Sequence, residues 1–374
     1  MKLCILFSSN IIKNFNQLRN IFNIYDITLL FHISLKENIK NNLNNNYFQY
    51  NNIYSKNIVY YHDDNLLKIL NLYDILFLLE TPVLNYFNID KDIDINPKIY
   101  FLHHGVTAMF PNNSIEKKRL IKTFRLWMNN EKVNIITCCT NLHTILTNLN
   151  IKNLYKINSL PQFYLNDKYL NNKYINDIVI FPTIFGLKHD INELNKIINI
   201  LNNRFNYKNI IIKLKSKCES HEFIQIQIKN LKKKYKNINF EFGIQNSSYY
   251  FNSFLTIILD GGTTFMESLI LNKKTIMHKI NVVNIHYQNY PIEFNKLLIS
   301  YDLNTFTDNL DKINNETYFD EEYNKDIKKL IKFHIGVEKI SNFEEDFKEN
   351  IIYPYLVEKN NNLKKIYNKL INKQ

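Results

Sequence analysis

The feature of the sequence that most constrains its fold is a recurrence of short apolar runs, many of them separated by segments with helical periodicity. In the first half of the chain these runs occupy residues 2–7, 26–31, 57–61, 74–79, 98–103 and 133–138. They are rich in Ile, Leu, Val, Tyr and Phe without clean polar alternation, which is typical of strands buried on both faces of a parallel sheet. Residues 11–22 and 117–128 show helical periodicity.

The second half repeats this scheme, with strands predicted at residues 177–183, 209–214, 238–242, 254–259 and 274–278, and helices at 191–201, 221–235 and 263–271. Such alternation predicts right-handed βαβ units and a parallel sheet. The chain has 374 residues, and at roughly 150 residues per domain we expect two domains. The predicted fold class is therefore α/β, with two Rossmann-like domains that face a cleft. We place the first at 1–162, the second at 163–340, and a C-terminal helical segment that packs back on the first at 341–374.

Composition narrows the class of protein. Hydrophobic residues make up 45% of the chain, enough for two cores, and the net charge of +12 favours anionic partners. Only four of the basic residues are Arg, which weighs against base-specific nucleic-acid recognition. The apolar run at the N-terminus is too short for a signal peptide, and no segment approaches the roughly 18 apolar residues that span a bilayer. We expect a cytoplasmic protein, which is either free in the cytoplasm or peripheral on the inner face of the cell membrane. We expect no nucleic-acid partner.

The strongest local feature is the segment Asp260-Gly261-Gly262-Thr263-Thr264, which follows a buried run and opens a helical one. Glycine allows a sharp turn and close approach of a ligand, and the N–H groups and Thr hydroxyls that follow could bind phosphate at the helix N-terminus. Glu267, one turn later, is placed to reach a ribose hydroxyl. The alternative is an ordinary tight turn before a helix that Thr263 or Thr264 caps. Both interpretations stay open.

A second candidate site is His103-His104-Gly105, at the end of another buried run. Open α/β sheets bind ligands at the carboxyl ends of their strands, and imidazole has a pKa suited to taking a proton from a hydroxyl. His104 is the candidate base, with His103 beside it. Alternatively, one His caps the strand and the other is a hydrogen-bonded core residue.

A third candidate is the basic amphipathic helix predicted at residues 117–128. Lys117, Lys118, Arg125 and Trp127, the only tryptophan, could contact anionic lipid. Packing of the apolar stripe on the sheet is the favoured alternative. The sequence contains no P-loop, no dinucleotide-binding glycine motif and no zinc-ligand spacing, so we expect neither metal nor cofactor. The four cysteines are expected to be buried thiols.

Taken in order, segments between about residues 98 and 280 resemble the CDP-glycerol glycerophosphotransferase family, the teichoic-acid primases and polymerases. The resemblance lies in the order and spacing of His104-Gly105, residues 158–163, Phe181-Pro182-Thr183, Lys213-Leu214-Lys215-Ser216, and residues 259–264 followed by Asn272-Lys273-Lys274. It implies the GT-B fold, which has two Rossmann-like domains.

Two departures from the family pattern affect the expected activity. The second catalytic His of the family's Lys-Pro-His-Pro motif is replaced by Lys215, and His221 lies on a different predicted element. Gly261-Gly262 stands where the family has Tyr-Ser, which is more similar to the donor loop of GT-B glycosyltransferases. The missing second His, together with the biased composition of the chain, favours a sugar over a polyol phosphate as the transferred group.

The leading hypothesis is a transferase of surface-polysaccharide synthesis, which moves a sugar, or a glycerol or ribitol phosphate, from a nucleotide-linked donor to a glycan or lipid-linked acceptor. Residues 260–264 and Thr183 would bind the donor, Lys213 or Lys215 would offset charge on the leaving phosphate, and His104 would take the acceptor proton. Two alternatives stay open: a sugar-nucleotide epimerase of GT-B architecture, and a non-catalytic protein that binds nucleic acid or lipid through its basic charge.

Overall fold

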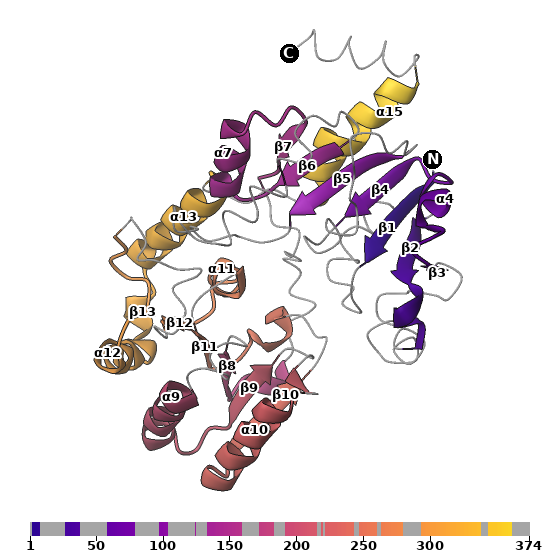
Figure 1. The fold of residues 1–374 in the computed structure, drawn as a ribbon. Coiled ribbons are helices and arrows are strands. Elements are labelled where there is room, and N and C mark those ends of the chain that lie inside the picture. The colour runs from indigo at the N-terminus through magenta and orange to yellow at the C-terminus, as the bar shows by residue number, and fades with distance from the viewer. Residues whose placement is uncertain are drawn as a thin grey trace. The chain divides into compact units, whose positions relative to one another are not determined.

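The computed structural model describes residues 2–7, 27–37, 58–78, 97–103, 124, 133–158, 172–182, 191–214, 218–219, 221–242, 247–259, 263–279, 293–337 and 343–360. These residues form two compact units. The first comprises the described residues of Met1–Val106, Lys118–Tyr164 and Ile335–Gln374, and the second comprises those of Leu165–His334. Each unit is built on its own parallel sheet (Figure 1).

The sheet of the first unit has seven strands in the order β3-β2-β1-β4-β5-β6-β7, all of them paired in parallel. The strands are β1 (Leu3–Phe7), β2 (Ile27–His32), β3 (Ile58–Tyr61), β4 (Ile75–Leu78), β5 (Lys98–His103), β6 (Val133–Thr137) and β7 (Leu154–Lys156). Strands β4 and β6 are buried along their whole length. Burial on both faces is the physical reason that their sequences lack polar alternation.

The helices of the first unit come from two distant parts of the chain. They are η1 (Ile33–Leu35), α4 (Leu66–Leu70), α7 (Thr140–Asn148), α14 (Phe343–Phe347), the π-helix η8 (Lys348–Ile352) and α15 (Tyr353–Lys359). Phe347 and Tyr355 are buried in the same apolar cluster as Leu3, Ile5 and Phe77 of the sheet. The rings of Phe347 and Phe77 lie 5.6 Å apart. Helices α14, η8 and α15 therefore supply part of the core that covers the first described strands (Figure 1).

The sheet of the second unit has six parallel strands in the order β10-β9-β8-β11-β12-β13. The strands are β8 (Ile178–Phe181), β9 (Ile210–Leu214), β10 (Ile238–Phe242), β11 (Leu255–Leu259), β12 (Thr275–His278) and β13 (Ile299–Ser300). The helices are η4 (Asn172–Tyr174), α9 (Ile191–Arg204), α10 (Glu222–Lys234), η6 (Ser247–Tyr250), α11 (Thr263–Ile270), α12 (Leu303–Ile313), η7 (Glu316–Tyr318) and α13 (Glu321–Ile335).

The two faces of this second sheet differ in what covers them. Because side chains alternate along a strand, Ile210 and Ile212 enter a large apolar cluster with residues of α9, α10 and α12. Ile211, between them, faces a smaller cluster that contains Tyr174 and Tyr250. The second face is therefore lined by tyrosines, which carry polar hydroxyls into a buried region.

The predicted α/β class with two parallel-sheet units is confirmed, and each strand predicted from the sequence is present within a few residues of its expected bounds. Strands β7 and β13 were not predicted, because segments of three and two residues are too short to show a period. The helix predicted at 11–22 lies outside the described residues, as does the one at 117–128 apart from Phe124. The four cysteines are free and buried, as predicted. Among the described helices, none combines the length and apolar character needed to cross a membrane.

The docking of the C-terminal helices gives a first prediction. Phe347 is 0% exposed, so Phe347→Ala should destabilise the first unit by about 3–5 kcal/mol, through lost burial and the cavity left behind. Tyr353→Ala is the matched control, because Tyr353 lies on the same segment but is 48% exposed and should cost less than about 1 kcal/mol. Urea unfolding of both variants would measure this, and equal losses would contradict the packing described here.

Candidate functional site

The strand order of the second sheet contains one reversal, which marks where a ligand would bind. The chain builds outward from β8 through β9 and β10, then returns to the other side of β8 with β11, β12 and β13. The topological switch point therefore lies between β8 and β11, and open α/β sheets bind ligands outside the carboxyl ends of the strands at such a point. Strand β8 ends at Phe181, before Pro182 and Thr183, and β11 ends at Leu259, before Asp260 and the two glycines. Two segments singled out in the sequence thus follow the two strands that flank the switch point.

Helix α11 begins directly after the glycine pair, and its burial pattern decides which side chains remain accessible. Phe265, Met266 and Leu269 are buried and anchor the helix to the unit. Thr264 and Glu267 are only half-buried, and their spacing of three residues puts them on one face of the helix. The two residues proposed for phosphate and ribose contacts can therefore act on the same side.

Among the remaining predicted site residues, some lie within the described part of the chain and others lie outside it. His103 ends β5, level with Thr137 of β6. In the first sheet the switch point lies between β1 and β4. His103 ends β5, which is separated from this switch point by β4. The predicted residues that lie outside the described residues are Lys117, Lys118, Arg125, Trp127, Thr183, His104, Lys215, Asp260, Gly261 and Gly262.

Lys213 is the penultimate residue of β9 and is 8% exposed. It lies on the tyrosine-lined face of the sheet, because Ile212 and Leu214 on either side of it enter the main core. Its Nζ lies 5.3 Å from the centroid of the Tyr250 ring, a geometry that stabilises a cation. Burial nevertheless lowers the pKa of the Lys213 ammonium to about 8, and the nearby Glu241 carboxylate opposes this effect. Lys213 is thus a buried lysine that can change charge near neutral pH.

Glu241 is the centre of a polar cluster that the sequence did not reveal. It is the register partner of Lys213 on the neighbouring strand β10. The Tyr174 hydroxyl lies 2.7 Å from Glu241 Oε1 and 2.8 Å from Oε2, and the Tyr250 hydroxyl lies 2.8 Å from Oε2. Lys173 Nζ lies 3.7 Å from Oε1. The only local signal was one Glu between two Phe residues of a short strand, and that signal does not identify its partners.

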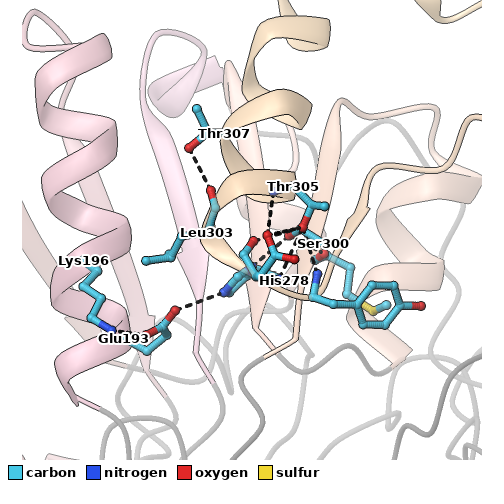
Figure 2. Close-up of polar contacts among 10 residues, drawn as sticks. Glu193, Lys196, His278, Ser300, Leu303, Thr305 and Thr307 are labelled. Carbon is cyan, nitrogen blue, oxygen red and sulfur yellow. Dashed lines mark hydrogen bonds and ion pairs between the residues drawn. The ribbon is translucent and has the colours of Figure 1, made fainter.

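A second polar cluster lies at the carboxyl ends of β12 and β13 (Figure 2). His278 is 1% exposed, with Nδ1 at 2.8 Å from Ser300 Oγ and Nε2 at 3.8 Å from Glu193 Oε1 of α9. Ser300 donates its own proton to the Met277 carbonyl at 3.3 Å. Since Ser300 is also fully buried, this Ser–His–Glu series lacks an accessible nucleophile. It links the first turn of α9 to the edge of the sheet instead.

A third cluster lies in the first unit, at the carboxyl ends of β6 and β7. Thr137 Oγ1 is 3.0 Å from His143 Nδ1, and burial, with a smaller effect of Lys156, lowers the pKa of His143. Lys156 Nζ donates to the carbonyl of Ile335 at 2.6 Å. Burial raises the pKa of the Cys138 thiol, so this thiol is not a nucleophile at neutral pH. His143 is a neutral imidazole that the sequence did not single out.

Metal ligation finds no support among the described side chains, where no group of three or more His, Cys, Asp or Glu residues is close enough to hold an ion. The described part of the candidate site offers cations and hydrogen-bond donors instead. Such groups suit an anionic ligand.

Comparison with known proteins identifies the fold. No family model matches the chain, and no curated protein matches its sequence. Among solved structures, a putative UDP-N-acetylglucosamine 2-epimerase from Listeria monocytogenes aligns with 92% of each chain at 8% identity and a TM-score of 0.59. A structure described as trehalose-6-phosphate from E. coli bound with UDP-2-fluoro glucose aligns with 93% of this chain and 98% of its own, at 10% identity and a TM-score of 0.54.

TarM from S. aureus also matches, at 14% identity and a TM-score of 0.47, and this chain spans 56% of its length. At such identities, the likeness of the full-length matches concerns the fold. The two units of this chain have the GT-B fold.

The lowered pKa of Lys213 gives a second prediction. Replacing this buried charge in Lys213→Met should stabilise the second unit at pH 7 by about 1–3 kcal/mol, because the cost of burying the ammonium outweighs its attraction to Glu241. The folded-state pKa of about 8 lies below the unfolded value of about 10.4. Stability of the parent therefore rises with pH between these values, and the advantage of the variant should shrink across that window.

Denaturant unfolding at pH 7 and at about pH 9.5 would measure this difference. Lys229→Met is the control, because Lys229 is exposed on α10 and its replacement should change stability by less than about 0.5 kcal/mol at either pH. An advantage of Lys213→Met that grows with pH would contradict the assigned direction of the pKa shift.

Proposed function

We propose that this chain is a GT-B-fold transferase that moves a sugar from a nucleotide-activated donor to a hydroxyl group of a surface glycan, capsule or teichoic-acid-like acceptor. The observation that carries the proposal is the position of the Pro182-Thr183 and Asp260–Thr264 segments. They follow β8 and β11, the two strands on either side of the switch point in the second sheet. Full-length structural neighbours support it, one of them described as bound with UDP-2-fluoro glucose.

The donor would bind with its pyrophosphate at the start of α11. Gly261 and Gly262 permit close approach of the backbone, and the first N–H groups of the helix and the Thr264 hydroxyl donate to the phosphate oxygens. Glu267, on the same helix face as Thr264, would accept a hydrogen bond from a ribose hydroxyl. Lys213 would offset the charge that builds on the leaving diphosphate. We propose that these groups suffice without a metal ion.

The transfer step would need one base. The acceptor oxygen forms a bond to the anomeric carbon of the sugar, while the bond from that carbon to the donor phosphate breaks and the nucleoside diphosphate leaves with the bonding electrons. His104 takes the proton of the acceptor hydroxyl, a role that suits an imidazole near pH 7. Nucleotide donors are made inside cells, so the enzyme would work in the cytoplasm or on the inner face of the membrane. The basic segment at residues 117–128 would be its membrane contact.

Two other reactions fit the same fold. Transfer of glycerol or ribitol phosphate would match the order of segments shared with the CDP-glycerol glycerophosphotransferases. A sugar-nucleotide epimerase is favoured by one specific observation, the match to the putative UDP-N-acetylglucosamine 2-epimerase. An epimerase would convert its nucleotide sugar without any acceptor, whereas a transferase would consume donor only when an acceptor hydroxyl is present. Product analysis with and without acceptor separates these reactions.

Nucleotide recognition gives a third prediction. One class among CDP-, UDP-, GDP- and ADP-linked donors should raise the melting temperature, since a ligand that binds only the native state adds about 2.7 kcal/mol at 100 times its Kd. Gly262→Asp should abolish the shift, because a carboxylate would occupy the phosphate position. Asn230→Asp, which adds the same charge on the exposed face of α10, should leave it intact. No shift with any nucleotide would refute the donor site.

The role of His104 gives a fourth prediction. His104→Ala should lower kcat by about 10²–10⁴-fold, the usual contribution of a general base, while the thermal shift caused by the donor stays unchanged. His143→Ala is the matched control, because His143 is also in the first unit but is bonded to Thr137. Activity would be followed by release of nucleoside diphosphate. Full activity in His104→Ala would remove this residue from the mechanism.

A further inference from the structure

Lys213 and Glu241 lie in one row that crosses the sheet at the switch point. The register pairs Ile258 of β11 with Phe181 of β8, and Lys213 of β9 with Glu241 of β10. Ile180 pairs with Ile212, so Phe181 and Lys213 are level. The row therefore runs Ile258–Phe181–Lys213–Glu241 on a single face. Neighbouring strands are about 4.8 Å apart, and Lys213 lies one strand from β8 and two strands from β11.

Glu241 is held in one position by tyrosines from two distant parts of the chain. Tyr174 and Tyr250 are 2% and 1% exposed, and both donate to its carboxylate. Burial and the hydrogen bonds to Glu241 raise the pKa values of both tyrosines, so each hydroxyl keeps its proton and remains a donor. The two rings lie 5.0 Å apart and pack against Tyr249. The carboxylate is therefore a fixed negative charge beside Lys213.

We propose that Glu241 is a positioning residue, which keeps Lys213 protonated and in place for the phosphate groups of a nucleotide donor. This inference rests on the proposed function, and it adds that donor binding takes up a proton. The titratable described groups around Lys213 are Glu241 on β10, Tyr249 and Tyr250 on η6, and Lys173 and Tyr174 on η4. Glu241 is the only carboxylate of this described set, and its charge opposes the effect of burial on the pKa of Lys213.

The consequence is a donor affinity that depends on pH. Burial holds the pKa of Lys213 at about 8 even with Glu241 present, so the amine is neutral in much of the protein above that pH. A bound phosphate favours the ammonium, and donor binding therefore takes up a proton. If only the protonated form binds, Kd should rise about tenfold between about pH 7 and about pH 9.

The test is to titrate the parent and variants with UDP-glucose, GDP-mannose, ADP-glucose and CDP-glycerol, and to follow the one that binds tightest from about pH 6.5 to about pH 9. Glu241→Gln keeps an acceptor for the tyrosine hydroxyls but removes the charge. It should weaken binding at pH 7 by several-fold and move the rise in Kd to lower pH. Lys213→Arg, which stays charged, should remove the pH dependence, and Lys213→Met should bind weakly at every pH. Titration of the donor itself is common to all variants and cancels in the comparison.

Two controls separate this role from a structural one. Glu222→Gln, on the exposed face of α10, should follow the parent profile. Tyr174→Phe removes one hydrogen bond to Glu241 and should shift the profile in the same direction as Glu241→Gln, but less. If Glu241→Gln changes only the melting temperature and leaves the pH profile in place, Glu241 is merely structural. A parent Kd that is constant with pH overturns this inference alone, whereas no binding of any donor overturns the proposed function as well.

Discussion

Parallel pairing of the strands is the constraint on which the rest of this structure depends. In a parallel sheet every strand must be followed by a crossover, so all carboxyl ends meet at one edge. Because the strand order reverses beside β8, the connection after β8 and the connection after β11 lead to opposite sides of the sheet. A phosphate-binding segment placed after either strand reaches the same place, although residues 182 and 260 are far apart in the sequence. The position of the candidate site thus follows from the strand order, and the strand register fixes which residues lie level with one another.

The same sheet carries polar groups whose burial is unfavourable by itself. A lysine and a glutamate occupy adjacent positions on β9 and β10, at a depth where neighbouring residues are aliphatic or aromatic. Lys213 is buried and Glu241 is partly buried. These positions are tolerated because Glu241 accepts two tyrosine hydrogen bonds and Lys213 lies over an aromatic ring. Apolar side chains would pack here at lower cost. A charge retained near the carboxyl end of β9 is consistent with the phosphate contact proposed for Lys213.

The His278 cluster shows the opposite outcome for similar chemistry. A serine, a histidine and a glutamate lie in series, yet the serine is buried and its proton is given to a backbone carbonyl. Residue identity alone would invite a catalytic interpretation. Burial and hydrogen-bond direction instead assign the cluster to holding α9 and β13 together (Figure 2). Whether polar residues at a strand end can be catalytic therefore has to be judged from their accessibility as well as from their residue types.

The sequence by itself determined the strands and the fold class, because strands buried on two faces need continuous apolar runs, and such runs are visible without any tertiary information. It also predicted that a helix begins directly after the glycine pair, where α11 begins at Thr263. It could not find Glu241 as a centre of interactions, because Tyr174 lies 67 residues away in the chain and nothing local connects them. The short strands β7 and β13 were missed for a related reason: each exists through pairing with a longer neighbour. Only the tertiary structure decided these features, since strand register and long-range side-chain contacts arise when distant segments pack together.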